Sequence, residues 1–216
     1  ITISHSLNPE EGYLPIPGSR GIWGPYLLNS YGILLGNRRV EKGMPVADYV
    51  LTGHADLRSR RGVAIGFDLK DTRMRKNYDM KGLSMYFIED ADPNINPTYL
   101  NRGAVERNRH RIALQSLWEL PLEEENKNAK WFGVANLNIL SDEYVLRDFF
   151  MDLSSTEDKP DNTLRVERLT RKDQLMLWTR LAPNDYYSTD QRLELSHYHA
   201  RSTVGKSRIA YEGRSN

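Results

Sequence analysis

The feature that most constrains this chain is a two-residue alternation of apolar and polar side chains, which recurs along most of its length. Residues 63–70 show it most clearly, because every second position there is apolar: Val63, Ile65, Phe67 and Leu69. Successive side chains of a β-strand point to opposite faces, so a period of two indicates strands with one apolar and one polar face. The chain is therefore expected to be all-β.

About ten alternating segments, each roughly ten residues long, can be traced in the sequence. Short turns such as 59–62 and long polar loops such as 90–101 separate them, which is typical of sequential antiparallel strands. The expected strands are residues 25–35, 47–58, 63–70, 80–89, 109–120, 131–140, 164–170, 174–182, 192–199 and 203–211.

Residues 109–120 allow two interpretations. Ala113 and Leu117 are four residues apart, as are Leu114 and Trp118, so an amphipathic helix that ends before Pro121 is one of them. The other is a strand, because apolar and polar residues also alternate there. We expect the strand, with the helix as the alternative.

Strand length distinguishes two classes of all-β protein. The mean strand of a soluble protein has about five or six residues, whereas a tilted strand needs about 9–11 residues to cross a bilayer. The segments match the second length, which favours an antiparallel up-and-down transmembrane β-barrel. The mean hydropathy of −0.64 is compatible with that class, because a barrel strand is apolar only at alternate positions.

Composition excludes several classes of function. Thirty basic and 29 acidic residues give a net charge of +1, so the chain lacks the basic field of a nucleic-acid-binding protein. The sequence contains no cysteine, which excludes disulfides, thiolate catalysis and cysteine zinc sites. It also lacks a run of about 18 apolar residues, which a membrane-spanning helix would need.

Residues 1–24 differ in character from the alternating remainder, 25–216. Proline occurs at positions 9, 15, 17 and 25, and each proline lacks the N–H group that a central strand or a helix interior would use. We therefore expect residues 1–24 to form an irregular entry segment or an edge.

The sequence contains no convincing catalytic site or cofactor site. His197 and His199 would share a strand face and could bind a metal, but the sequence identifies no third ligand. Gly-x-Ser-x-Gly and glycine-rich phosphate loops are both absent. We expect a protein that is not an enzyme and that uses no cofactor.

Basic clusters at the ends of the segments are interpreted as charged turns, with contact to anionic groups as the alternative. These clusters are Arg58–Arg61 and Arg107–Arg111. Asp148 is expected to be solvated or to bond the neighbouring Arg147.

Four stretches carry a family resemblance. Residues 141–150 read SDEYVLRDFF and have the pattern of a strand end followed by a polar loop, and residues 21–31, 54–70 and 187–195 agree with other family elements. They resemble the barrel domain of the lipopolysaccharide-assembly outer-membrane protein family LptD, also called the organic solvent tolerance protein family. Glu194 stands where the family usually has proline. The motif residues are Ser141, Asp142, Tyr144, Leu146, Asp148 and Phe149.

The resemblance implies a partial, non-catalytic barrel of the cell outer membrane, with about ten strands of a larger barrel. Such a barrel receives lipopolysaccharide from periplasmic bridge proteins and inserts it into the outer leaflet, and a plug lipoprotein (LptE-like) sits inside it in many members. Its lateral exit is a weakly paired seam near the first strands. Candidate residues for this lateral gate are Pro15, Pro17 and Pro25.

In such a barrel one face of each strand meets outer-membrane lipid and the other lines a wet lumen. Candidates for the lumen are Thr52, His54, Asp56, Arg58, Asp68, Lys70, Asn136 and Asn138. Two other classes stay open. A soluble all-β binding module, a sandwich or small barrel, would bury the apolar faces inward. An outer-membrane enzyme would need a catalytic set on adjacent strands.

Overall fold

The structure of the protein is a computed structural model. It describes residues 11–41, 44–72, 82–94, 105–120, 129–151, 162–184, 192–203 and 210–215.

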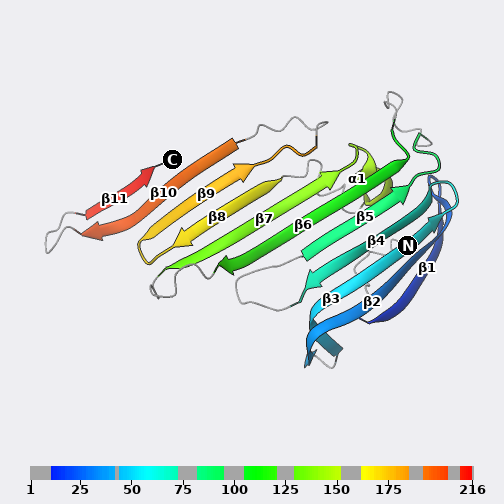
Figure 1. The fold of residues 1–216 in the computed structure, drawn as a ribbon, viewed down its shortest axis with the longest axis horizontal. Coiled ribbons are helices and arrows are strands. Elements are labelled where there is room, and N and C mark those ends of the chain that lie inside the picture. Colours follow the sequence, from blue (N-terminus) through cyan, green and yellow to red (C-terminus); the bar gives the residue numbers. More distant parts are fainter. Residues whose placement is uncertain are drawn as a thin grey trace. The chain divides into compact units, whose positions relative to one another are not determined.

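The described chain contains strands and one short helix (Figure 1). The strands are β1 (Gly12–Arg20), β2 (Gly24–Glu41), β3 (Met44–Arg58), β4 (Gly62–Asp71), β5 (Gly82–Glu89), β6 (Asn108–Leu120), β7 (Lys130–Leu140), β8 (Thr163–Leu169), β9 (Asp173–Arg180), β10 (Arg192–Thr203) and β11 (Ala210–Ser215). The helix, α1, spans Val145–Phe149.

The strands form an antiparallel meander in which each strand pairs with the next one in the sequence. This confirms the all-β antiparallel prediction. The described sheet is not closed into a barrel, because β1 and β11 are its two end strands. Residues 109–120 belong to β6, so the strand interpretation is confirmed and the helix is wrong there. Among the described residues, no helix is long and apolar enough to cross a membrane.

One part of the sheet matches an alternative left open by the sequence, and two strand boundaries differ from the predictions. Residues 12–20 form the strand β1 at the edge of the sheet, which is the edge alternative predicted for residues 1–24, and Pro15 and Pro17 there remove no hydrogen bond from an inner ladder. β2 continues beyond the expected end at residue 35 to Glu41, after a register shift between Leu35 and Arg38. The prediction of a single strand at 203–211 is wrong, because Thr203 ends β10 and β11 begins at Ala210.

The chain divides into two compact units. Unit 1 comprises residues 1–114 and 138–160, and unit 2 comprises residues 115–137 and 161–216.

In unit 1, one face of β1–β5 is apolar and exposed. Ile65 on β4 pairs with Ala55 on β3 and with Phe87 on β5, and its side chain is 64% exposed. Beside this row, Leu57 pairs with Val63, and both are exposed. The exposed large apolar residues of this face are Tyr13, Tyr31, Ile33, Leu35, Leu57, Val63, Ile65, Phe67 and Phe87.

The opposite face of unit 1 carries polar and charged side chains. His54 Nε2 lies 2.7 Å from Asp68 Oδ2 across β3 and β4, and Thr52 is directly opposite Asp68. Asp56 and Arg58, farther along the same face of β3, are buried. Lys70 continues the same face of β4 but is exposed, and Asn138 on β7 is buried.

Unit 2 has the same division of faces. Leu177 on β9 pairs with Val166 on β8 and with Leu195 on β10, and all three are exposed. On the other face, Gln174 Nε2 donates a 2.6 Å hydrogen bond to Glu167 Oε1. The remaining lumen candidate, Asn136, is half-buried and accepts a hydrogen bond from the Gln115 amide.

The paired histidines of unit 2 are next to a carboxylate. His199 Nδ1 lies 2.6 Å from Asp173 Oδ1, and His197 Nε2 lies 3.6 Å from the same oxygen. In the part of the chain that the structure describes, no group of three or more His, Asp or Glu side chains could hold a metal ion.

A glycine substitution tests the turn between β3 and β4. Gly62 has φ +83°, and a Cβ there would overlap the carbonyl oxygen of Glu89. We expect Gly62→Ala to lower the free energy of unfolding by about 1–3 kcal/mol, measured by urea titration of tryptophan fluorescence. Gly53→Ala is the control, because its Cβ would meet open space, and we expect little change. Equal losses for the two variants would contradict this role of Gly62.

Candidate functional site

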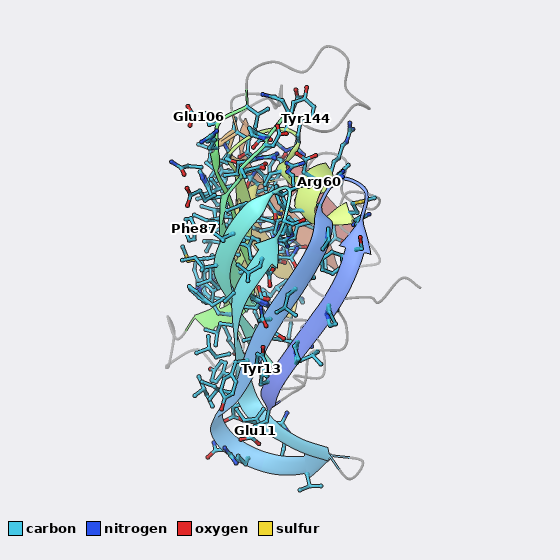
Figure 2. All side chains as sticks on the ribbon, turned by 90° about the vertical axis from the view of Figure 1, so that its right-hand side faces the viewer. Glu11, Tyr13, Arg60, Phe87, Glu106 and Tyr144 are labelled. Carbon is cyan, nitrogen blue, oxygen red and sulfur yellow. The ribbon has the colours of Figure 1, made fainter. Side chains whose placement is uncertain are left out.

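The candidate site is the connection after β7, residues 141–150, where it folds over the polar face of unit 1. Trp23 Nε1 donates a 2.7 Å hydrogen bond to the backbone oxygen of Asp148. Val145, Leu146 and Phe149 on α1 are buried. Figure 2 shows Tyr144 toward the same end of the strands as Arg60 and Glu106, away from Glu11 and Tyr13.

Asp142 shapes the turn that precedes α1. Its Oδ2 accepts a 2.8 Å hydrogen bond from the Ser141 hydroxyl, and its Oδ1 accepts a 2.9 Å bond from the Tyr144 backbone N–H. An aspartate that accepts from the N–H group two residues later forms an Asx turn, which stabilises a reversal of the chain. The turn directs the chain from β7 into the helix.

Two arginines, Arg61 in the turn between β3 and β4 and Arg109 on β6, hold α1 through Asp148. Arg61 Nη2 lies 2.9 Å from Asp148 Oδ2, and Arg109 Nη1 lies 2.6 Å from the same oxygen. Asp90 joins the same two arginines, with contacts of 2.5 Å to Arg61 Nη2 and 3.0 Å to Arg109 Nη1. The side chains of all four residues are 0% exposed.

Arg109 also binds Asp142 with two parallel contacts. Its Nε lies 2.8 Å from Asp142 Oδ2, and its Nη2 lies 2.6 Å from Asp142 Oδ1. This two-bond geometry is the strong form of arginine–carboxylate pairing. We call Arg61, Asp90, Arg109, Asp142 and Asp148 the Arg–Asp network.

Aromatic rings enclose the cationic groups beside the network. The guanidinium carbons of Arg58, Arg61 and Arg109 lie 5.3, 4.8 and 5.2 Å from the centre of the Phe149 ring. Arg58 also lies 4.7 Å from the Trp23 ring centre. Such contacts stabilise desolvated cations through the negative face of the ring.

Arg58 belongs to a second polar group on the same face. Its Nη2 donates to Asp56 at 3.2 Å and to the Tyr86 hydroxyl at 3.0 Å, and that hydroxyl donates to Asp56. Asp56, Arg58 and Tyr86 are all buried.

The contacts at this site hold α1 in place, and we refer to this role as an anchor. Isolated buried charges are very costly, so removing one member of a buried pair exposes the other to that cost. Three carboxylates face two guanidinium groups within the Arg–Asp network, so the network offers no excess positive charge to an anionic ligand. It fastens α1 to the turn at Arg61, to the end of β5 and to β6.

The structure brings the sequence motif of residues 141–150 together with residues that the sequence did not single out. Asp142 and Asp148 enter the network, Leu146 and Phe149 are buried, Ser141 bonds Asp142, and the N–H of Tyr144 completes the turn. Five residues of this site were not predicted to take part in it, although Arg61 and Arg109 belong to the basic clusters noted in the sequence: Trp23, Arg61, Tyr86, Asp90 and Arg109. Local sequence held no signal for them, because Arg61 and Asp148 are 87 positions apart.

Residues 59–61 form the predicted turn, but three arginines of the basic clusters are not exposed to solvent. Arg58, Arg61 and Arg109 are buried, whereas Arg60 and Arg107 are exposed. Asp148 is likewise fully buried instead of solvated. Around the buried charged groups, ionic and aromatic partners replace water, and only the folded chain supplies those partners.

The three prolines lie apart from the network contacts. Pro15 and Pro17 are exposed on the edge strand β1, where they pair with Asn29 and Leu27. Pro25 is exposed near the start of β2 and pairs with Ser19.

Comparison of the chain with family models and with curated proteins finds no match.

Removing the central carboxylate tests the anchor. We expect Asp148→Ala to lower the free energy of unfolding by about 3–5 kcal/mol, because Arg61 and Arg109 would lose a buried counter-charge. Glu143→Ala is the control: Glu143 is exposed five residues earlier, and we expect a change below about 0.5 kcal/mol. Urea titration of both variants measures the difference. A loss for Asp148→Ala no larger than that of the control would show that the network does not hold α1.

Proposed function

We propose that this chain is part of an outer-membrane β-barrel that receives lipopolysaccharide from the periplasm and inserts it into the outer leaflet. The observation that carries the proposal is the division of faces, in which apolar side chains are exposed and charged side chains are buried. Ile65 and Leu193 are 64% and 75% exposed, whereas Arg61 and Asp148 are fully buried.

A bilayer accounts for this division better than water does. Burying apolar surface is the main favourable term in the folding of water-soluble proteins, and broad exposed apolar surfaces on them mark interaction sites. A barrel strand instead exposes its apolar residues to lipid and turns its polar residues inward. Each unit has this arrangement when considered separately, which supports a lipid-facing sheet over a single docking patch.

The lipopolysaccharide step rests on the family resemblance of residues 141–150 and of the three other stretches. The Arg–Asp network supports this by giving most of the motif residues a physical role at one end of unit 1. In the proposed barrel, the face with Thr52, His54 and Asp68 lines the lumen, and Pro15 and Pro17 weaken pairing at the edge that forms the lateral gate.

The proposed role is non-catalytic transport. Its partners are lipopolysaccharide, outer-membrane lipid, periplasmic bridge proteins and an LptE-like plug lipoprotein. Polar side chains on the lumen face would offer hydrogen bonds to sugar hydroxyls, and the apolar face would keep the barrel in the membrane.

Folding in two media tests the membrane placement. We expect circular dichroism and size-exclusion chromatography to show a defined β-rich species in detergent micelles and aggregation in plain buffer. A monodisperse, cooperatively melting monomer in buffer would overturn the proposal in favour of a soluble all-β module.

A pair of substitutions tests which face meets lipid. We expect Ile65→Arg to lower the free energy of unfolding in phospholipid vesicles by about 2–4 kcal/mol if Ile65 lies near the midplane. Asp68→Asn, on the other face of β4, should cost much less, because an amide can still bond His54. Equal costs for the two variants would contradict the proposed facing.

Photo-cross-linking in a Gram-negative host tests the cargo. We expect a photoreactive residue at Lys70, exposed on the polar face, to capture lipopolysaccharide, and one at Ile65 to capture phospholipid instead. Capture of lipopolysaccharide at neither position would argue against the transport role while leaving the membrane placement standing.

A further inference from the structure

A groove lies on the apolar face of unit 1, at the end of β4, β5 and β6 that adjoins the turn at Arg61. It has a volume of about 360 Å³. Ligand sites commonly measure about 300–1,000 Å³ and combine apolar walls with a few polar groups. The outward side chains that line it are Val63, Ile65, Phe87, Glu89, Asn108 and His110.

Along the strand direction, the groove is polar at one end and apolar at the other. Glu89 ends β5 and Asn108 begins β6, so these polar groups lie where the strands end. Ile65 and Phe87 pair across β4 and β5 closer to the middle of the strands. The Phe87 and His110 rings, with centroids 6.3 Å apart, join the apolar and polar parts.

The polar side chains at one end of the groove can still form hydrogen bonds or ion pairs with a ligand. The side chains of Glu89, Asn108 and His110 make no hydrogen bond or ion pair with any residue that the structure describes. A carboxylate can bind an ammonium group, and an amide and an imidazole can donate hydrogen bonds to a phosphate oxygen. These groups together are complementary to a zwitterion.

We propose that this groove binds a membrane phospholipid with an aminoethyl phosphate headgroup, such as phosphatidylethanolamine. Glu89 pairs with the ammonium group, Asn108 and His110 donate to the phosphate, and one acyl chain lies along Val63, Ile65 and Phe87. The order of polar and apolar parts matches a lipid standing in a leaflet, with its headgroup at the strand ends. This inference rests on the proposed membrane placement but not on the lipopolysaccharide step.

Native mass spectrometry of the full chain tests the site. The protein is released from detergent micelles that contain equal amounts of phosphatidylethanolamine and phosphatidylcholine, and the bound lipids are counted. We expect phosphatidylethanolamine to be enriched by about tenfold, because a primary ammonium donates charge-assisted hydrogen bonds to Glu89 that a quaternary one lacks.

Two matched variants test whether Glu89 causes the enrichment of phosphatidylethanolamine. Glu89→Gln keeps the shape of an exposed side chain but removes its charge, and we expect it to abolish the enrichment. Glu106→Gln removes an exposed carboxylate at the same end of the strands but outside the groove, and should leave the enrichment unchanged (Figure 2).

The outcomes separate this proposal from the one it rests on. Folding in detergent with equal binding of both lipids, or enrichment that survives Glu89→Gln, overturns the headgroup site and leaves the membrane placement intact. A chain that folds as a monomer in plain buffer and carries no lipid overturns both.

Discussion

The structure of unit 1 depends on the pairing of two buried arginines with two buried aspartates. Arg61 and Arg109 share Asp90 and Asp148, and none of these side chains reaches solvent. Because each charge is tolerable only while the others are present, α1, the turn at Arg61 and the ends of β5 and β6 must be in place together. The network therefore specifies one position for the connection after β7.

The location of this network accounts for the burial of charged side chains in unit 1, whose apolar side chains are exposed on the other face. One end of its polar face is covered by α1, which brings Asp148 and Phe149 to the arginines. The apolar face has no corresponding cover among the described residues, and Ile65 and Phe87 are exposed on it. In the proposed bilayer setting both faces would be satisfied, since lipid would contact the apolar side and the ion pairs satisfy the charges.

Local pattern was sufficient to predict most strands. The alternation in residues 63–70 and 47–58 recurs in β4 and β3, and the alternating interpretation of residues 109–120 was correct against a helical one. Prediction was weaker where tertiary contacts override local signals. Proline content left an irregular segment or an edge open for residues 12–20, and only the tertiary structure decided for the edge strand β1, which tolerates missing N–H groups.

The sequence by itself determined the class of the fold, because a period of two can place apolar residues on one face only in strands. It also marked residues 141–150 as distinctive. Only the tertiary structure decided which charged side chains are buried and which are exposed. Arg60 and Arg61 are neighbours, yet one is exposed and the other buried, since only Arg61 reaches Asp90 and Asp148. Such pairing depends on residues that are distant in the chain, and no local pattern encodes it.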